Sequence, residues 1–273
     1  MSERRGKKLN RLLESLSDAG LVTSAWLAKQ GYSRSLVALY VASNWLESPT
    51  RGVYLRKGGK LLWDGVVNTL QLRERLPLHV GGRFALAWQG HEHYLRLGRE
   101  GPVTLFGSSR LPGWVVKLAL VPSLKACGRS PFDFPAADFS SEETFDTLKL
   151  QGLERLQVSS NTDPIVMATP ERAMLELCDQ AIAAADIHEA NALMQGLTTL
   201  RPSKLTVLLG HCTSIKAKRL FLALADRHAH AWLAQVDQAH VDLGRGKRAL
   251  VSKGRLHPKY HITLPADLDE QLG

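Results

Sequence analysis

The sequence contains few cysteines and no hydrophobic run long enough to cross a membrane. Its three cysteines, Cys127, Cys178 and Cys212, stand far apart and lack the C-x-x-C spacing of metal and redox sites. A sparse, odd set of this kind fits reduced thiols inside the cell. No apolar stretch approaches the roughly 20 residues that a spanning helix needs, and the basic N-terminus leads into an amphipathic segment, unlike a secretory signal. We therefore expect a soluble, cytoplasmic protein that does not bind membranes.

Motifs that indicate catalysis are also scarce. His91-Glu92-His93 and His228-Ala229-His230 can each place two histidines on one face of a strand, but neither pair has an obvious third metal ligand nearby. The segments 58–60 (GGK) and 244–247 (GRGK) lack the full G-x-x-x-x-G-K-[ST] pattern of a phosphate loop. The sequence also has no nucleophile-elbow motif. We expect no enzymatic activity, no bound metal and no cofactor.

Positive charge, by contrast, is concentrated at one end of the chain. The 273 residues carry a formal net charge of +9, and 44% of them are hydrophobic, enough for the core of one large domain or two smaller ones. Residues 1–62 hold eleven Lys and Arg against four Asp and Glu, which is +7 of that total. A basic first quarter joined to a nearly neutral remainder is typical of an N-terminal domain, here called the head, that binds a polyanion such as nucleic acid, followed by a larger part with a different function.

Two short helices joined by a tight turn are predicted between residues 23 and 43. Thr23 or Ser24 can cap the first helix, because a side-chain oxygen there satisfies free backbone N–H groups. Gly31 can form the turn, since glycine adopts backbone conformations that other residues avoid. Ser33 can cap the second helix, which should end near residue 43.

The segments on either side of these helices complete a winged helix-turn-helix. After them, two short strands at 45–46 and 53–56 should flank the turn-rich segment 48–52 as a β-hairpin. Before them, apolar spacing predicts a helix over 9–18, and residues 1–8 should form a mobile basic arm. A winged helix-turn-helix binds duplex DNA, so this pattern predicts a DNA-binding head.

The second of these helices has two distinct faces. At about 100° per residue, one broad arc is apolar and should pack in the core: Leu36, Val37, Leu39, Tyr40 and Val41. The opposite arc carries Arg34, Ser35, Ala38 and Ala42. A face this small fits a major groove roughly 12 Å wide. An ordinary amphipathic helix with alanines toward solvent is the alternative interpretation.

We expect contacts of two kinds between this head and DNA. Arg34, Ser35 and Ala38 should face base edges, since the N-terminus of a recognition helix is the part that touches bases. The residues expected at phosphates or in the minor groove are Ser33, Thr50, Arg51, Lys57, Arg4, Arg5, Lys7 and Lys8.

The remainder of the chain predicts a larger mixed domain, which makes the fold class α+β. Helices are expected over 61–71, 83–88 and 170–179. The last of these leads into an α-helical block whose other members, at 188–197, 201–209 and 214–232, should carry charge on their outer faces. Strands are expected at 94–97, 103–106, 148–150, 156–158 and 165–167, and a terminal hairpin at 248–251 and 260–264.

Basic residues gather on that terminal hairpin, with no acid between Asp242 and Asp267. They are Arg245, Lys247, Arg248, Lys253, Arg255 and Lys259. Three interpretations stay open for this second patch: a solvated surface, a second phosphate contact, or a docking surface for an acidic partner.

Several short segments of the chain match those of one protein family and occur in the same order. Each match is weak evidence alone, but the shared order makes the set more specific. They are Gly31-Tyr32-Ser33, Trp45-Leu46, Arg51-Gly52-Val53-Tyr54, Trp63-Asp64-Gly65, the stretch 79–95, Leu105-Phe106-Gly107, Thr169-Pro170-Glu171-Arg172-Ala173, and the terminal 244–248 and 260–263. Together they resemble the AbiEi-type antitoxins of type IV toxin–antitoxin systems, which are bacterial proteins with a winged-helix head.

The resemblance implies two roles for the chain. The head, residues 1–60, would repress the protein's own operon by binding repeats in promoter DNA, with 33–43 as recognition helix and 47–52 as wing. The AbiEi-like α+β domain, residues 61–273, would be needed to counter a nucleotidyltransferase-like toxin. The implied partners are therefore double-stranded promoter DNA and a cognate toxin.

Two other functions stay open on the sequence. The chain could be a stand-alone winged-helix regulator whose C-terminal domain senses a ligand or oligomerises. It could also be a nuclease with a DNA-targeting head, which would need carboxylates and a lysine clustered around a metal. The primary sequence contains no such cluster, although folding could assemble one.

Overall fold

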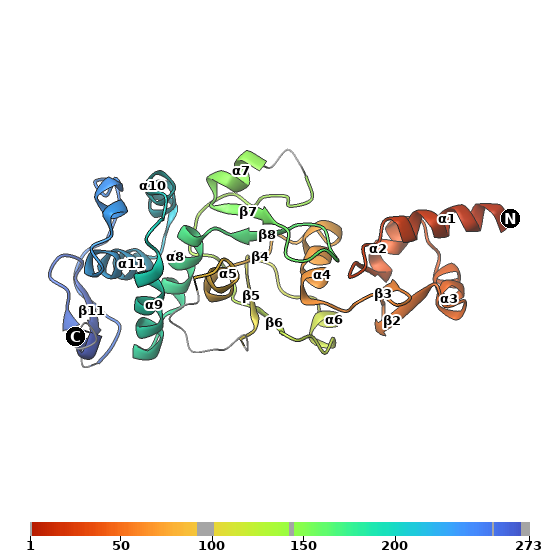
Figure 1. Ribbon diagram of the computed structural model, residues 1–273, viewed down its shortest axis with the longest axis horizontal. Coiled ribbons are helices and arrows are strands. Elements are labelled where there is room, and N and C mark those ends of the chain that lie inside the picture. The colour runs from red at the N-terminus through yellow and green to blue at the C-terminus, as the bar shows by residue number, and fades with distance from the viewer. Residues whose placement is uncertain (1, 92–100, 142–144, 253, 269–273) are drawn as a thin grey trace.

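Three parts follow one another along the long axis of the molecule (Figure 1). A small head lies at the N-terminal end, a five-stranded sheet with its helices lies in the middle, and a helical block with a small sheet lies at the C-terminal end. This computed structural model describes residues 2–91, 101–141, 145–252 and 254–268, with side chains from residue 6 onward. Its mixture of helices and strands confirms the α+β class.

The head is built from three helices and three strands. They are α1 (Ser2–Glu14), β1 (Leu21–Thr23), α2 (Ser24–Lys29), α3 (Arg34–Ala42), β2 (Leu46–Thr50) and β3 (Val53–Arg56). The strands form an antiparallel sheet in the order β1-β3-β2. The two predicted short helices and the hairpin are therefore present, with β2 longer than expected and the turn confined to Arg51 and Gly52.

Polar caps explain where α2 and α3 begin. The Thr23 hydroxyl accepts a hydrogen bond from the Trp26 N–H at 3.1 Å, and the Ser33 hydroxyl accepts one from the Leu36 N–H at 3.2 Å. Gly31 lies between the helices with a φ of 79°, a left-handed conformation that favours glycine. These caps and the turn confirm the predicted local structure.

Helix α1 differs from the prediction at both ends. It begins at Ser2, so residues 2–8 are helical and the expectation of a mobile arm is wrong. It ends at Glu14 rather than at residue 18. Glu, Arg and Lys form helices readily, and one glycine inside the helix, at a cost of about 1 kcal/mol, does not stop it.

The head has its own hydrophobic core, in which one predicted member is missing. The core consists of Leu12, Leu16, Val22, Leu27, Tyr32, Val37, Tyr40 and Leu46. Leu39 was expected there, but its side chain is 44% exposed. The helix packs against α1 and the sheet along a narrower arc than the apolar pattern indicates, because so small a domain covers only one side of α3.

The head joins the central part through close contacts. Gly65 in α4 (Trp63–Asn68) lies so near Ala19 that a Cβ on this glycine would come within 2.0 Å of the Ala19 carbonyl oxygen. The Arg73 guanidinium, at the end of the π-helical η1 (Thr69–Arg73), lies 4.7 Å from the ring centroid of Trp26. These contacts hold one side of the head against the body, while α3 lies at the outer end of the molecule (Figure 1).

The central sheet has five strands in the order β6-β5-β4-β8-β7. The elements of this part are β4 (His79–Val80), α5 (Gly82–Trp88), β5 (Val103–Phe106), α6 (Gly113–Val116), β6 (Leu124–Ala126), α7 (Phe145–Leu150), β7 (Leu153–Leu156), β8 (Ile165–Ala168) and α8 (Pro170–Gln180). The expected strand at 148–150 is wrong, because these residues lie in α7, and the next strand lies at 153–156 rather than 156–158. The strand expected at 94–97 lies outside the described residues.

The helical block contains α9 (Ala184–Gly196), α10 (Pro202–His211), α11 (Ile215–Arg227) and the 3-10 helix η3 (Ala231–Gln235). The single helix expected over 214–232 is therefore broken, and Ala229 adopts a φ of 48° at the break. Charge also lies inside the block: Arg219 of α11 is fully buried, contrary to the expectation for 214–232, and so are Glu171 and Glu176 of α8. These charges have internal partners, described below.

The C-terminal part forms a three-stranded sheet rather than a simple hairpin. It consists of β9 (Arg248–Ala249), β10 (Gly254–Leu256) and β11 (Ile262–Pro265), in the order β10-β11-β9. Strands β10 and β11 pair antiparallel, but β9 pairs parallel with β11. The two strands that the sequence indicated are thus neighbours in the sheet without being the two arms of one hairpin.

Candidate nucleic-acid interface

The outward face of α3 is made of small side chains with an arginine at its start. Arg34, Ser35, Ala38, Leu39 and Ala42 are exposed, whereas the buried residues of the helix lie on its other side. Figure 1 places α3 at the outer end of the head, away from the central sheet. The predicted base-facing residues Arg34, Ser35 and Ala38 therefore share one accessible surface.

The N-terminus of α3 is held by a pair of serines. Ser33 caps the helix, and its hydroxyl lies 3.1 Å from the hydroxyl of Ser35. This arrangement keeps two hydroxyl groups beside Arg34 at the positive end of the helix dipole, where an anionic group is stabilised. A phosphate contact by Ser33 stays a prediction.

The hairpin tip presents one cation beside a fixed turn. Arg51 is exposed at the tip, and Gly52 follows it with a φ of 80°. The Gly52 carbonyl accepts a hydrogen bond from the Ser24 N–H at 2.8 Å, which ties the tip to the start of α2. The Ser48 hydroxyl donates to the carbonyl of Thr50 or Val53, at 2.9 and 3.1 Å. The tip is therefore braced from two sides.

Two other cations of the head have acidic partners on the surface. Lys57 lies 2.7 Å from Glu47, and Arg56 lies 3.4 Å from Asp18. The hydrogen bonds that Lys57 and the Gly58 N–H donate lower the pKa of the Glu47 carboxyl. The predicted phosphate contact of Lys57 would have to compete with this ion pair, although such exposed pairs contribute little.

The basic residues of α1 differ in their surroundings. Lys7 is exposed, whereas the Lys8 ammonium donates to the Gly31 carbonyl at 2.9 Å. Lys8 thus fastens α1 to the turn before α3. Arg4 and Arg5 lie in the first turns of the helix, and their side chains are outside the described part of the chain.

Comparison with known families identifies the family of the whole chain. Residues 100–265 match a family model described as "Transcriptional regulator, AbiEi antitoxin, Type IV TA system". Residues 5–97 match the model for the AbiEi antitoxin N-terminal domain of such regulators. The chain belongs to the AbiEi family. The family resemblance found in the sequence is thereby confirmed.

Among solved structures, the AbiEi-family chain resembles the crystal structure of the RV2827C protein from Mycobacterium tuberculosis. The TM-score is 0.53 at 17% sequence identity, and the match covers 98% of this chain and 94% of that chain. At this identity the likeness shows a shared fold alone. No curated protein matches the sequence. Within the described residues, no helix is both long and apolar enough to span a bilayer.

The second basic patch lies in the part matched by the AbiEi antitoxin model, at the other end of the molecule from α3 (Figure 1). Five of its predicted members, Arg245, Lys247, Arg248, Arg255 and Lys259, are exposed. Lys259 pairs with Asp226 at 3.4 Å and lies 4.9 Å from the ring centroid of Tyr260. Lys253 lies outside the described residues. The structure therefore separates the two basic regions that the sequence identified.

A buried arginine explains the GRGK segment next to this patch. The Arg219 guanidinium of α11 donates to the carbonyl oxygens of Leu243, Gly244, Gly246 and His261, at 2.7 to 3.2 Å. Carbonyl oxygens turned toward a cation cannot cradle a phosphate, which needs N–H donors. The segment surrounds the Arg219 guanidinium with its carbonyl oxygens, whereas a phosphate loop directs backbone N–H groups at its ligand.

The H-x-H pairs have protein partners rather than a metal-like arrangement. His228 lies 3.0 Å from the Asn191 side chain, and His230 lies 2.7 Å from the Met194 carbonyl oxygen, so both rings attach to α9. Of the other pair only His91 is described. Across the described residues, no group of three or more His, Cys, Asp and Glu could hold a metal ion.

An ionic network under the central sheet was missed by the sequence analysis. Glu176 on α8 is fully buried and accepts hydrogen bonds from the Arg172 Nε at 2.9 Å, the Ser130 hydroxyl at 3.2 Å and the Gly82 N–H at 3.2 Å. His79 lies 2.7 Å from the same carboxylate. Burial raises the pKa of Glu176, but His79 and Arg172 outweigh this effect and hold it below its usual range. The i,i+4 spacing of Arg172 and Glu176 was the available signal.

A cavity of about 300 Å³ opens beside this network, walled in part by Phe132, Phe134 and Arg172. The Arg172 guanidinium also donates to the Gln151 carbonyl at 2.6 Å and to the Ser130 hydroxyl at 2.9 Å. Glu176 balances the charge of Arg172, and each of the three guanidinium nitrogens donates to an acceptor of the protein. We interpret the network as a structural link between α8, β4 and the loop at residue 130.

Proposed function

We propose that this AbiEi-family protein is a winged helix-turn-helix repressor that binds promoter repeats of its own operon. The order of the head, helix–strand–helix–helix–strand–strand, and its antiparallel three-stranded sheet support this assignment. Residues 1–60 would then form the DNA-binding domain, and 61–273 the antitoxin domain. Helix α3 would enter the major groove, with the hairpin as a wing beside it.

One observation carries this proposal: the exposed face of α3 is narrow, begins with Arg34 and belongs to the most basic part of the chain. Arg34 would donate to a guanine edge, which is the commonest specific contact in the major groove. Ser35 and Ala38 would lie against neighbouring bases. Arg51 at the hairpin tip would meet the phosphate backbone, which positions a protein without specifying sequence.

Further phosphate contacts are assigned by their freedom to reach DNA. Lys7 in α1 and Thr50 at the end of β2 belong to the head, as does the exposed face of α3. Arg4 and Arg5 precede Lys7 in α1, toward the N-terminus. Lys8 and Lys57 already have protein partners, so we expect each of them to contribute less than Arg51.

The repressor role is tested in cells with the protein's own promoter fused to a reporter gene. Wild type should lower reporter output, and Arg34→Ala should restore it while the variant accumulates to the same level. Footprinting on the same promoter should then show repeated protected sites. A reporter unaffected by wild type would refute autoregulation.

We propose that the same chain counters a nucleotidyltransferase-like toxin through its C-terminal domain. Membership of a family described as type IV antitoxins supports this role. Co-expression with the product of the adjacent gene tests it: growth arrest by that product should be relieved by wild type and also by the DNA-binding variant Arg34→Ala. Growth arrest that persists with wild type would remove the antitoxin role and leave the regulator.

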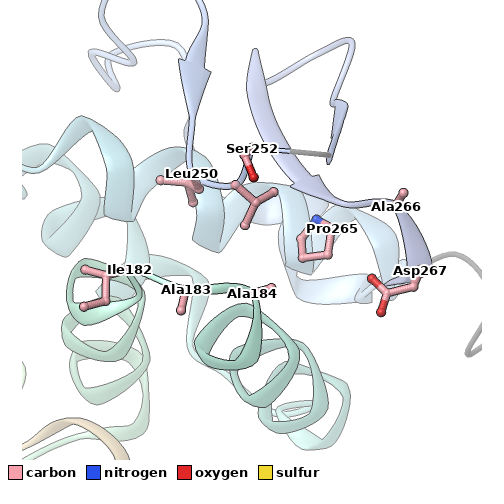
Figure 2. Close-up of a pocket in the computed structure, with 9 residues that line it drawn as sticks. Ile182, Ala183, Ala184, Leu250, Ser252, Pro265, Ala266 and Asp267 are labelled. Carbon is pink, nitrogen blue, oxygen red and sulfur yellow. The ribbon is translucent and has the colours of Figure 1, made fainter.

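A second candidate function, a regulator with a ligand-sensing or oligomerising C-terminal domain, is favoured by one feature. An open hollow of about 550 Å³ lies between the α8–α9 turn and the C-terminal sheet, with mostly apolar walls. Figure 2 shows Ile182, Ala183 and Ala184 on one side and Leu250 and Pro265 on the other. If no adjacent toxin exists, Ile182→Asp tests this function. If the C-terminal domain oligomerises, the variant should have a lower mass in solution than wild type. If the domain senses a ligand, the variant should alter the effect of that ligand on repression.

A further inference from the structure

Leu39 is the large apolar side chain that α3 exposes, on the side of the outward face that borders Leu36. It is 44% exposed, although its neighbours Val37 and Tyr40 are buried. At about 100° per residue it lies between Ser35 and Ser43 on the same side as Ala38 and Ala42. This position makes it part of the surface proposed above to meet bases.

The core of the head does not need Leu39. Val37 and Tyr40 are buried, and Leu36 and Val41 pack partly against the same core. Neither the central sheet nor the C-terminal part covers α3, which lies at the outer end of the molecule (Figure 1). Leu39 is not part of the core cluster of the head, and nearly half of its surface is open to a partner.

The charge of the surroundings points to DNA as that partner. Leu39 belongs to a segment with eleven Lys and Arg against four Asp and Glu, which attracts a polyanion. The face itself offers few groups that can bond to base edges: the Arg34 guanidinium and the Ser35 hydroxyl. Its other members end in methyl groups, and a base edge pressed against them would lose hydration without a replacement.

One group in the major groove suits such a surface. The C5-methyl of thymine is the apolar group that base pairs present there, and apolar side chains recognise it by contact. We propose that Leu39, with Ala42 beside it on the exposed face, contacts thymine methyl groups and gives this head its preference for thymine within its binding site. This inference rests on the proposed DNA binding and adds the base that α3 selects.

The helix geometry adds a spacing. An α-helix rises about 1.5 Å per residue, so Leu39 lies roughly 7 Å along the axis from Arg34. Base pairs are spaced about 3.4 Å apart. For a helix that lies along the groove, the thymine contact falls about two base pairs from the guanine contact of Arg34.

The experiment replaces thymine by deoxyuridine, which removes only the C5-methyl group, at each position of the bound DNA in turn. Wild type should lose about three- to fivefold in affinity at one or two positions, the expected effect of one buried methyl. Leu39→Ala should bind the thymine DNA roughly tenfold more weakly and should no longer distinguish thymine from deoxyuridine there. Leu39→Met, which remains apolar, should keep the distinction. When cytosine replaces the contacted thymine, wild type should bind more weakly. Using 5-methylcytosine in place of that cytosine restores the C5-methyl group and should recover part of the wild-type affinity.

Two controls separate recognition from folding. Val116, exposed on α6 in the central part, supplies a matched truncation, and Val116→Ala should leave affinity and deoxyuridine sensitivity unchanged. The thermal unfolding of Leu39→Ala should match that of wild type. A Leu39→Ala variant that unfolds early would contradict the argument that the core does not need this residue, and Leu39→Gln, which keeps the length of the side chain but is polar, would then carry the test: it should lose the distinction.

The outcomes distinguish this inference from the function on which it rests. Sequence-specific binding by wild type with no effect of deoxyuridine at any position would overturn the thymine contact and leave the repressor proposal standing. Equal deoxyuridine sensitivity in wild type and Leu39→Ala would assign the methyl contact to another residue and overturn the role of Leu39. Absence of specific DNA binding would remove both proposals together.

Discussion

Lys8 of α1 and Tyr32, in the turn that precedes α3, interact through a hydrogen bond and a cation–π contact. The Tyr32 hydroxyl donates to the Lys8 carbonyl oxygen at 3.0 Å, and the Lys8 ammonium lies 5.7 Å from the centroid of the Tyr32 ring. The same ammonium donates to the Gly31 carbonyl at 2.9 Å. The position of α3, and so of its exposed face, therefore depends on α1.

Removing the Tyr32 hydroxyl should destabilise the head. Tyr32→Phe keeps the buried ring but loses the hydrogen bond to Lys8, so the free energy of unfolding should fall by about 1 kcal/mol in a urea titration. Tyr54→Phe is the matched control, because within the described part of the chain the Tyr54 hydroxyl has no hydrogen bond. Equal stability of Tyr32→Phe and wild type would show that the contact does not fasten α1.

Arg34→Ala should reduce discrimination between the protein's own promoter and altered sequences. Loss of a bidentate arginine–guanine contact costs about 1–3 kcal/mol at that base pair. The measurement compares the affinities of wild type and variant for the native site and for sites with each base pair exchanged. If Arg34→Ala lost affinity equally for every sequence, Arg34 would be a phosphate contact and our placement of the base-facing surface would be wrong.

Arg51→Ala should weaken binding to all sequences alike. A side chain that neutralises one phosphate releases about one counterion, so the slope of log affinity against log salt should flatten by about one unit. Arg245→Ala, an exposed arginine at the opposite end of the molecule, is the control and should leave the slope unchanged. A flatter slope for Arg245→Ala would instead assign the second basic patch to DNA.

Acid should selectively remove the contribution of a buried carboxylate in α8. Burial raises the pKa of Glu171, but hydrogen bonds from the Arg201 side chain, at 2.8 and 2.9 Å, and from its backbone N–H outweigh this and lower the pKa to about 2. A lowered pKa in the folded state means stability that is present above the unfolded pKa, near 4.5, and is lost as the pH falls toward 2.

Glu171→Gln should therefore be less stable than wild type at pH 7 by about 1.5–3 kcal/mol, the range for hydrogen bonds to a charged group. The two unfolding free energies should converge below pH 4.5, as the unfolded wild type becomes protonated. Curves that stay parallel down to pH 2 would contradict the lowered pKa.

The local features of the head could be predicted from the sequence because short-range chemistry decides them. Thr23 and Ser33 cap their helices through N–H groups three residues away, and Gly31 and Gly52 occupy left-handed turns. Each of these interactions requires only neighbouring residues. The positions of the predicted DNA contacts followed from them, and their roles stay predictions.

The remaining differences arise from contacts between distant segments. Leu39 fits an apolar periodicity, but only the folded head decides how much of α3 the core covers. Strand β9 pairs parallel with β11, and Glu176 meets His79 across 97 residues, so neither could be derived from local pattern. Charge was expected on the outer face of 214–232, and periodicity alone does not reveal that Arg219 of α11 is buried among four carbonyl oxygens, or that Arg172 and Glu176 of α8 pair inside the protein.

The central claim, that the head recognises specific DNA through α3, is tested most directly by equilibrium binding to the protein's own upstream DNA. Fluorescence anisotropy across a salt series, with a scrambled duplex of the same composition as competitor, measures both affinity and specificity. We predict tight binding to the native duplex that survives excess competitor, and loss of this preference in Arg34→Ala. Equal affinity for native and scrambled duplexes, falling together with salt, would mean that the head is a general polyanion-binding surface and would contradict the account.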